Sequence, residues 1–434
     1  MDTRPVSGSY THLLEGIERE EITITDVRVT PLTWKPPDGS YVEEDGPVVI
    51  PTRSISVMQV FTDQGIIGIG PGPRRVHEDD GRAYERAIGR NPFDIELLGL
   101  SGGLDIACWD IIGKAKGMPV YRLLATDHEP NPQVHVYASG GVNWTYYDPG
   151  DGRPCGVDAL IEEALAYKAL GFDTFKWRPG TDWEEAGMTG KRLGEEVCRP
   201  LREAVGPDFD LGLEKKAYDA WTFEQCLEVA PIIDELGFLF FEQPMMDIGE
   251  AQFDDYRALK ERMPHVMLWG GESFRHRLQA RPWIEQGIYD VIQSDCIGPG
   301  ITENWHIARI AHYYGRRMTP HNWLSALGTM CNTHFVAGVP NGLMCEYFLY
   351  PNTPWRDALL TEPYRPVNGV ITLSEEPGFG VSLRPIEELQ EEFPYDPSAP
   401  EMLPNPRFPH AYERAKARER AVRDHYLGSP RGAA

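Results

Sequence analysis

The sequence predicts an α/β protein organised around a β/α barrel. Short apolar runs alternate with amphipathic helical segments across residues 131–350, a pattern typical of parallel strands connected by helices. Eight such runs lie at 134–138, 173–177, 209–214, 238–242, 266–269, 290–293, 316–319 and 343–348. Eight units favour a closed barrel, but a doubly wound open sheet would show a similar alternation, so the spacing alone leaves closure open.

Residues 1–130 predict a separate α+β domain before the barrel. Strand-like runs at 22–32 and 54–61 are followed by a helical stretch at 103–124, where apolar residues recur at helical spacing. The barrel domain is then expected to occupy 131–350.

Residues 351–434 return to turns and short strands. A proline-rich segment at 393–409 leads into a charged helix at 412–426. A solvated helix that packs on a neighbouring element is the expected structure of this last part, which we interpret as a surface extension.

The composition of the chain disfavours several classes of function. The 434 residues include 66 Asp and Glu against 42 Lys and Arg, a formal net charge of -24 that disfavours binding to nucleic acid or to an anionic membrane. No window approaches the roughly 18 apolar residues of a membrane span, and the first residues lack the apolar core of a signal peptide. The seven cysteines form no CxxC pair, which indicates reduced thiols and a cytoplasmic location.

Seven of the predicted strands end in charged side chains. The C-terminal ends of parallel barrel strands face one common pocket, so these side chains should converge there. They are Lys176 with Arg178, Glu214, Glu242, Glu272, Asp295, His321 and Glu346, and successive positions are about one β/α unit apart.

Three of these residues predict a metal site. Glu214, Glu242 and Glu272 stand at successive strand ends, and a bound cation would make the burial of three converging carboxylates tolerable. Oxygen ligands without cysteine or histidine favour Mg²⁺. The alternative is that one or two of these glutamates are helix N-caps or ion-pair partners.

Asp295 and His321 predict an acid–base pair. A carboxylate that binds one imidazole nitrogen fixes the tautomer and raises the pKa of the ring, which suits a general base or acid. Lys176 and Arg178, on alternate residues of one strand, are expected to point in different directions, one to the pocket centre and one to a neighbouring strand. Either cation can hold an anionic oxygen. Together these groups suit removal of the proton next to the carboxylate of a hydroxy acid, with the metal stabilising the resulting enediolate.

Several motifs in this order resemble the enolase superfamily, and within it the mandelate racemase-like subgroup that contains many acid-sugar dehydratases. They are LDIACWD at 104–110, FKWRP, FFEQP, GGES, QSDCIGPGITE and TPHNW, and the resemblance spans about residues 22–385. It implies a (β/α)₇β modified TIM barrel, a capping domain built from both chain ends, and a homo-oligomer.

The resemblance also implies where specificity resides. Capping loops at 34–51 and 71–75 would close on the substrate, a small sugar acid. Their candidate substrate contacts are Trp34, Tyr41 and Arg74.

Carried over by position, the resemblance gives roles to the strand-end residues. Glu242 and Glu272 match metal ligands, and Asp295 and His321 match a dyad whose imidazole is base or acid. Glu346 matches a carboxyl group near the substrate carboxylate.

Lys176 and Arg178 match the family's Lys-x-Lys strand, whose second lysine is a base in some members. A guanidinium stays protonated at neutral pH, so Arg178 cannot take that part. A mechanism with one base, His321, is therefore expected instead of a two-base racemisation.

The third strand departs from the family pattern. Counting from the strand places Glu214 at the ligand position, whereas counting back from the following helix places Lys216 there. We favour Glu214, because loops accept insertions more readily than strands accept register shifts. Lys216 is then a candidate substrate contact.

These observations predict a Mg²⁺-dependent acid-sugar dehydratase that forms a 2-keto-3-deoxy acid. A cycloisomerase or epimerase that shares the enolate is the alternative among enzymes. A catalytically silent barrel that binds an acid is the alternative of another class, and the unusual EKK sequence at 214–216 motivates it.

Overall fold

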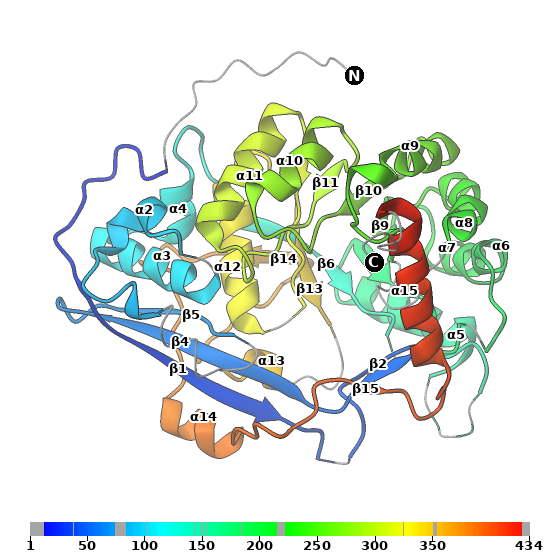
Figure 1. The fold of residues 1–434 in the computed structure, drawn as a ribbon, viewed down its shortest axis with the longest axis horizontal. Coiled ribbons are helices and arrows are strands. Elements are labelled where there is room, and N and C mark those ends of the chain that lie inside the picture. Colours follow the sequence, from blue (N-terminus) through cyan, green and yellow to red (C-terminus); the bar gives the residue numbers. More distant parts are fainter. Residues whose placement is uncertain are drawn as a thin grey trace, which may run out of the picture.

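Eight parallel strands form the centre of the protein (Figure 1). The structure is a computed structural model, and it describes residues 13–37, 39–73, 84–100, 102–142, 144–148, 150, 152, 154–183, 185–214, 222–323, 325–349 and 354–427. The strands are β6 (Gln133–Ser139), β7 (Thr174–Trp177), β8 (Asp210–Glu214), β9 (Phe240–Glu242), β10 (Met267–Gly270), β11 (Val291–Ile292), β12 (Arg317–Met318) and β13 (Cys345–Phe348).

The strands close into a barrel. Their order is β12-β11-β10-β9-β8-β7-β6-β13, with β13 pairing parallel to β6. A parallel bridge between Met318 and Gly342, with the Leu343 amide donating to the Met318 carbonyl at 2.9 Å, joins β12 to the segment before β13. All eight predicted strands are present, and the open-sheet alternative is wrong.

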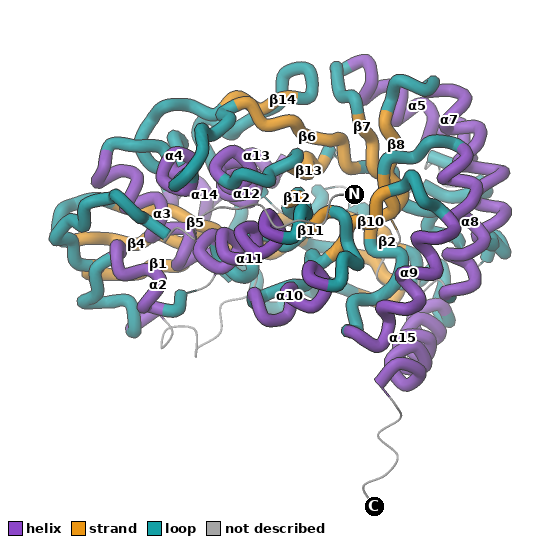
Figure 2. Tube along the Cα trace, turned by 90° about the horizontal axis from the view of Figure 1, so that it is seen from above, coloured by secondary structure: helices purple, strands orange, loops and turns teal. Residues whose placement is uncertain are grey.

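Helices follow the first seven strands and cover the outside of the barrel (Figure 2). They are α5 (Gly156–Ala169), α6 (Gly190–Leu193) running through a π-turn into α7 (Arg199–Val205), α8 (Phe223–Glu235), α9 (Phe253–Arg262), α10 (Arg277–Glu285), α11 (Ile301–Tyr313) and α12 (Ala326–Gly338). This arrangement is the predicted (β/α)₇β barrel.

Large aromatic side chains fill the barrel interior. The rings of Phe240 and Trp269 stack with centroids 3.7 Å apart, and Tyr137 packs edge-on against both. A Cβ atom at position 212 would stand 2.1 Å from the Phe240 ring, so only glycine leaves room for this packing.

An antiparallel sheet of β1 (Ile24–Trp34), β4 (Arg53–Thr62) and β5 (Ile67–Pro71) forms the predicted α+β cap, and α3 (Gly102–Lys116) packs on it. The single helix predicted at 103–124 is in fact two, because the chain breaks before α4 (Val120–Leu124). Gly117 adopts a left-handed conformation (φ +65°), and Pro119 begins the new helix.

The C-terminal segment returns to the cap before it crosses to the barrel. After β14 (Val370–Thr372), which pairs antiparallel with β6, α14 (Ile386–Glu392) contacts β1. β15 (Leu403–Pro404) then pairs with β3 (Val48–Ile50), which pairs with β2 (Glu43–Asp45). The cap is therefore built from both chain ends, as expected.

The predicted terminal helix is α15 (Ala411–Leu427), and it lies beside α9 of the barrel (Figure 2). The Tyr426 hydroxyl donates to the Asp255 carboxylate, and Arg414 pairs with Glu185 at 2.8 Å. Among the described residues, no helix has the length and hydropathy needed to cross a membrane.

Asn405→Ala should destabilise the cap. The fully buried Asn405 amide donates to Glu44 Oε1 at 2.8 Å and to the Gly46 carbonyl at 2.7 Å, so its loss leaves two buried acceptors without this donor. We expect a loss of about 1–3 kcal/mol of stability, measured by thermal and denaturant unfolding. Glu391→Ala, on the exposed face of α14, is the control, and equal melting curves for the two variants would contradict the prediction.

Candidate active site

The C-terminal ends of the barrel strands gather the predicted residues at one mouth. Lys176, Glu214, Glu242 and Glu346 lie within β7, β8, β9 and β13, respectively. The others lie in the loops that follow β7, β10, β11 and β12: Arg178, Glu272, Asp295 and His321.

Lys176 is the centre of a buried charge cluster. Its side chain is 0% exposed, and its ammonium contacts Glu214, Glu346 Oε1 at 2.8 Å and Glu242 Oε1 at 3.6 Å. Burial lowers the pKa of Lys176, but the three carboxylates outweigh burial and raise the pKa above its usual value. The cluster therefore favours the charged form of Lys176.

The expectation that Lys176 and Arg178 point in different directions is wrong. Residues two apart in a strand share one side of the chain, so both side chains reach Glu214. Arg178 Nε donates to Glu214 Oε2 at 2.7 Å. Burial opposes ionisation of Glu214, yet Arg178 and Lys176 lower its pKa below the usual range. Burial also opposes ionisation of Glu346, and Lys176 and His321 lower its pKa.

Glu242 is the carboxylate of this cluster whose negative charge the neighbouring cations balance least. Its Oε2 atom is buried and has no hydrogen-bond partner among the described residues. Burial raises its pKa to about 8, with Lys176 opposing the shift and Glu214 and Glu346 adding to it. A cation beside Glu242 would relieve this unfavourable environment.

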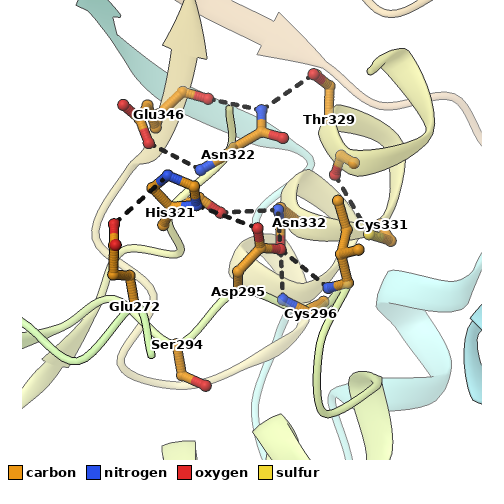
Figure 3. Close-up of polar contacts among 12 residues, drawn as sticks. Glu272, Ser294, Asp295, Cys296, His321, Asn322, Thr329, Cys331, Asn332 and Glu346 are labelled. Carbon is orange, nitrogen blue, oxygen red and sulfur yellow. Dashed lines mark hydrogen bonds and ion pairs between the residues drawn. The ribbon is translucent and has the colours of Figure 1, made fainter. Parts of the chain in front are cut away.

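His321 and Asp295 form the predicted pair (Figure 3). His321 Nδ1 lies 3.2 Å from Asp295 Oδ2, and Asn332 Nδ2 donates to Asp295 Oδ1 at 3.0 Å. His321 Nε2 points to the other side, 3.5 Å from Glu272 Oε2. The geometry fixes one ring nitrogen and presents the other to the mouth.

The carboxylates around His321 favour the protonated form of its ring. Burial lowers its pKa, but Glu272, Asp295 and Glu346 raise it to about 10. Glu346 Oε2 also accepts the Asn322 amide at 2.8 Å, which ties the loop carrying His321 to β13.

The cap contributes a carboxylate that the sequence analysis missed. Glu43 Oε2 accepts from Arg53 Nη2 at 3.0 Å and from Trp323 Nε1 at 3.2 Å, while Glu43 Oε1 lies 3.7 Å from Arg178 Nη1. The Trp323 ring covers the Arg178 guanidinium at 4.0 Å. Two signals were available in the sequence: Glu43 lies within the 34–51 loop, and Trp323 is the last residue of the TPHNW motif.

A cavity of about 840 Å³ opens beside the dyad, between barrel and cap. Asp295, His321 and Glu272 line its barrel side. Its cap side and rim are lined by Met58, Pro71, Gly72, Pro73, Tyr84, Arg86, Leu98, Gly99, Leu100, Gly102, Gly103 and Leu104.

The predicted substrate contacts lie elsewhere or outside the described residues. Trp34 is buried against Trp355, with ring centroids 6.4 Å apart, and Tyr41 is half-buried; neither lines the cavity. Arg74 and Lys216 fall in the segments 74–83 and 215–221, which lie outside the described residues.

The carboxylates fit a divalent cation at two positions. Glu242 has an unpartnered oxygen, and Glu272, at the next strand end, keeps 30% of its side chain exposed. Glu214 is instead engaged by Lys176 and Arg178, and no three acidic, histidine or cysteine side chains of the described ranges are grouped closely enough to hold a metal. Mg²⁺ commonly binds one or two carboxylates and takes its remaining ligands from water and substrate, so Glu242 and Glu272 suit it.

Comparison with known proteins relates this chain to one family and to enzymes that act on sugar acids or their lactones. The family described as Enolase C-terminal domain-like matches residues 159–387. The chain is 27% identical to the D-gluconate/D-galactonate dehydratase of Picrophilus torridus, over 78% of this chain and 80% of that protein. It is also 27% identical to the D-galactarolactone cycloisomerase of Agrobacterium fabrum, over 76% of this chain and 89% of that protein.

A solved structure supports the same fold. The 3,6-anhydro-D-galactonate cycloisomerase from Zobellia galactanivorans superimposes with a TM-score of 0.69 at 23% identity, covering 86% of this chain and 100% of that one. The barrel and its cap are thus shared with this neighbour.

Asp295→Asn should lower the pKa of His321. The substitution removes both the negative charge and the carboxylate acceptor at Nδ1, which raise that pKa. An NMR titration of the His321 ring measures the change. Asp158→Asn, exposed in the first turn of α5, is the control, and an unchanged His321 pKa in Asp295→Asn would contradict the assignment.

Proposed function

Because this chain belongs to the enolase C-terminal domain-like family, and to the mandelate racemase-like part of the enolase superfamily, we propose that it is a Mg²⁺-dependent acid-sugar dehydratase. The observation that carries the proposal is His321, bonded to Asp295 at Nδ1 and directed by Nε2 toward Glu272 in the cavity. The sugar-acid dehydratases among its relatives support the substrate class.

Glu242 and Glu272 would hold the cation. When bound, Mg²⁺ supplies positive charge for the substrate carboxylate and for the charge that develops on it. Lys176 supports this site from below, because its charge keeps Glu214 and Glu346 ionised without reaching the cavity itself. The bound cation would supply the positive charge that attracts an anionic acid to this mouth.

His321 would move the protons. In its neutral form Nε2 takes the proton on the carbon next to the carboxylate, while Asp295 holds the imidazolium that forms. The bond from the neighbouring carbon to its hydroxyl then breaks, and the Nε2 proton leaves with that hydroxyl as water. The enol that remains tautomerises to a 2-keto-3-deoxy acid.

A cycloisomerase or epimerase is the second candidate function. The 27% identity to a galactarolactone cycloisomerase favours it, and that chemistry would use the same proton abstraction by His321. Arg178 stays protonated at neutral pH, so it cannot be a second base on the opposite side of the substrate.

Incubation with Mg²⁺ and a panel of sugar acids in D₂O tests the proposal. We expect loss of the α-proton NMR signal and the appearance of a 2-keto-3-deoxy product with at least one acid. His321→Asn should slow both by about 10²-fold or more, because it removes the only proposed base. Product isomers without loss of water would favour the second candidate, and retention of every α-proton would overturn enolate chemistry.

Glu242→Gln should have opposite effects on stability and on metal binding. The raised pKa of Glu242 means that the folded protein holds a proton that the unfolded chain releases between about pH 4.5 and 8, so stability falls as pH rises through that window. The amide removes this dependence, and we expect stability near neutral pH to rise on the order of 1 kcal/mol without Mg²⁺.

With Mg²⁺ present, the same variant should lose the metal-linked increase in Tm that the unaltered protein shows. Glu391→Gln, on exposed α14, is the matched control. A full Mg²⁺-dependent increase in Glu242→Gln would remove Glu242 from the site.

A further inference from the structure

Asp247 contacts the residues that follow both proposed metal ligands. It lies in the loop between β9 and α9. Its Oδ2 atom accepts from the Ser273 hydroxyl at 3.2 Å, and the side-chain amide of Gln243 lies 3.5 Å from the same oxygen. Gln243 comes directly after Glu242, and Ser273 comes directly after Glu272. One carboxylate thus joins the ends of two neighbouring strands.

Buried tyrosines fix Asp247 from the other side. The Tyr289 hydroxyl donates to Asp247 Oδ1 and lies 2.9 Å from the Tyr256 hydroxyl. The Tyr256 hydroxyl in turn lies 3.0 Å from the Met245 carbonyl. Both tyrosines are buried, and the Trp283 ring stacks on Tyr289 with centroids 5.0 Å apart. The carboxylate has little freedom to rotate, because another rotamer would leave the buried Tyr289 hydroxyl without this acceptor.

The backbone after Glu242 is held in an unusual conformation. Gln243 has a φ of +43°, in the left-handed region that favours glycine. Its amide donates to the Trp269 carbonyl of β10 at 2.9 Å. A residue other than glycine stays in this conformation where the surrounding contacts fix it. The contact with Asp247 is one such contact, and it acts at the residue next to a proposed ligand.

Asp247 is close to the metal site but lies outside the cavity. Burial raises the pKa of Asp247 to about 6; the hydrogen bond from Tyr289 opposes this shift, and the negative charge of Glu272 adds to it. The two carboxylates are therefore near enough to interact. Glu272 and Ser273 line the cavity beside His321, whereas Asp247 does not.

We propose that Asp247 is a positioning residue for the cation site. It holds Gln243 and Ser273, and through them it keeps Glu242 and Glu272 directed toward one cation. This inference rests on the metal site of the proposed function. The two ligands stand on separate strand ends, so fixing both ends before the cation binds reduces the conformational entropy that binding must overcome.

Calorimetric titration of the protein with Mg²⁺, without any sugar acid, tests the proposal. Asp247→Asn should weaken Mg²⁺ binding on the order of 10-fold, a loss typical for residues that orient metal ligands. Asp254→Asn makes the same substitution at the exposed start of α9 and should leave the affinity unchanged. Equal Mg²⁺ affinities of Asp247→Asn and the unaltered protein would overturn the proposal.

Variants of Ser273 separate positioning from the effect of a nearby charge. Ser273→Ala keeps every charge but removes the donor to Asp247, so it should also weaken Mg²⁺ binding several-fold. Ser273→Thr keeps the hydroxyl and should bind Mg²⁺ as the unaltered protein does. Combining Ser273→Ala with Asp247→Asn should add little further loss, because both remove the same contact. Normal Mg²⁺ binding by Ser273→Ala would show that Asp247 acts by its charge alone, and the positioning role would be wrong.

Tyr256→Phe separates positioning from a general loss of stability. This variant removes the hydroxyl beyond Tyr289 and leaves the contacts of Asp247 itself in place. It should lower the Tm and leave the Mg²⁺ affinity unchanged. A loss of Mg²⁺ affinity as large as that of Asp247→Asn would give Asp247 a merely structural role and would overturn the proposal.

Hydrogen exchange without Mg²⁺ supplies a measurement that is independent of the metal. The amides of residues 271–274 should exchange faster in Asp247→Asn than in Asp254→Asn, and equal exchange rates would contradict the proposed hold on this loop. Neither experiment uses a substrate, so a failure to dehydrate any acid would leave both results standing. Absence of Mg²⁺ binding by the unaltered protein would overturn the metal site and this inference together.

Discussion

A lysine buried among three glutamates sets the charge balance of the barrel mouth. Lys176 Nζ contacts Glu214, Glu346 and Glu242, and a cation without exposed surface can stay charged only in such company. One positive charge, helped by Arg178, satisfies Glu214 and Glu346. The charge of Glu242 is balanced least, and its buried Oε2 atom has no hydrogen-bond partner in the described part of the chain. A further cation would therefore bind beside Glu242, at the end of β9. The neighbouring strand, β10, leads to Glu272.

The cap is electrostatically part of this mouth. Glu43 comes from β2, yet it accepts from Trp323 of the barrel and lies near Arg178. Arg178 therefore stands between a barrel carboxylate and a cap carboxylate, with an indole over its face. A change in how the cap sits would alter the environment of Arg178, and through Glu214 that of Lys176. The position of the cap and the electrostatics of the barrel cluster are coupled by these contacts.

Local sequence pattern was sufficient to predict the barrel strands, but it could not predict the contacts between the cap and the barrel. Strand runs and the charged residues that end them are close in sequence, so their periodicity predicted the eight strands and the position of His321 beside Asp295. Glu43 and Trp323 are far apart in the chain, and no local spacing predicts that they meet. The break between α3 and α4 was visible in Gly117 and Pro119 but was outweighed by the apolar helical spacing.

The pairing of β15 with β3 has a consequence for the order in which the molecule can form. Leu403 pairs with Val49, so a strand made after all the barrel strands completes a sheet begun before them. Every barrel strand emerges from the ribosome between these two partners. Neighbouring β/α units can pair as they appear, whereas the β2–β3 hairpin must wait for β15, which follows all of them. The cap edge that carries Glu43 should therefore be among the last parts to consolidate, which makes assembly of the barrel mouth a late event of folding.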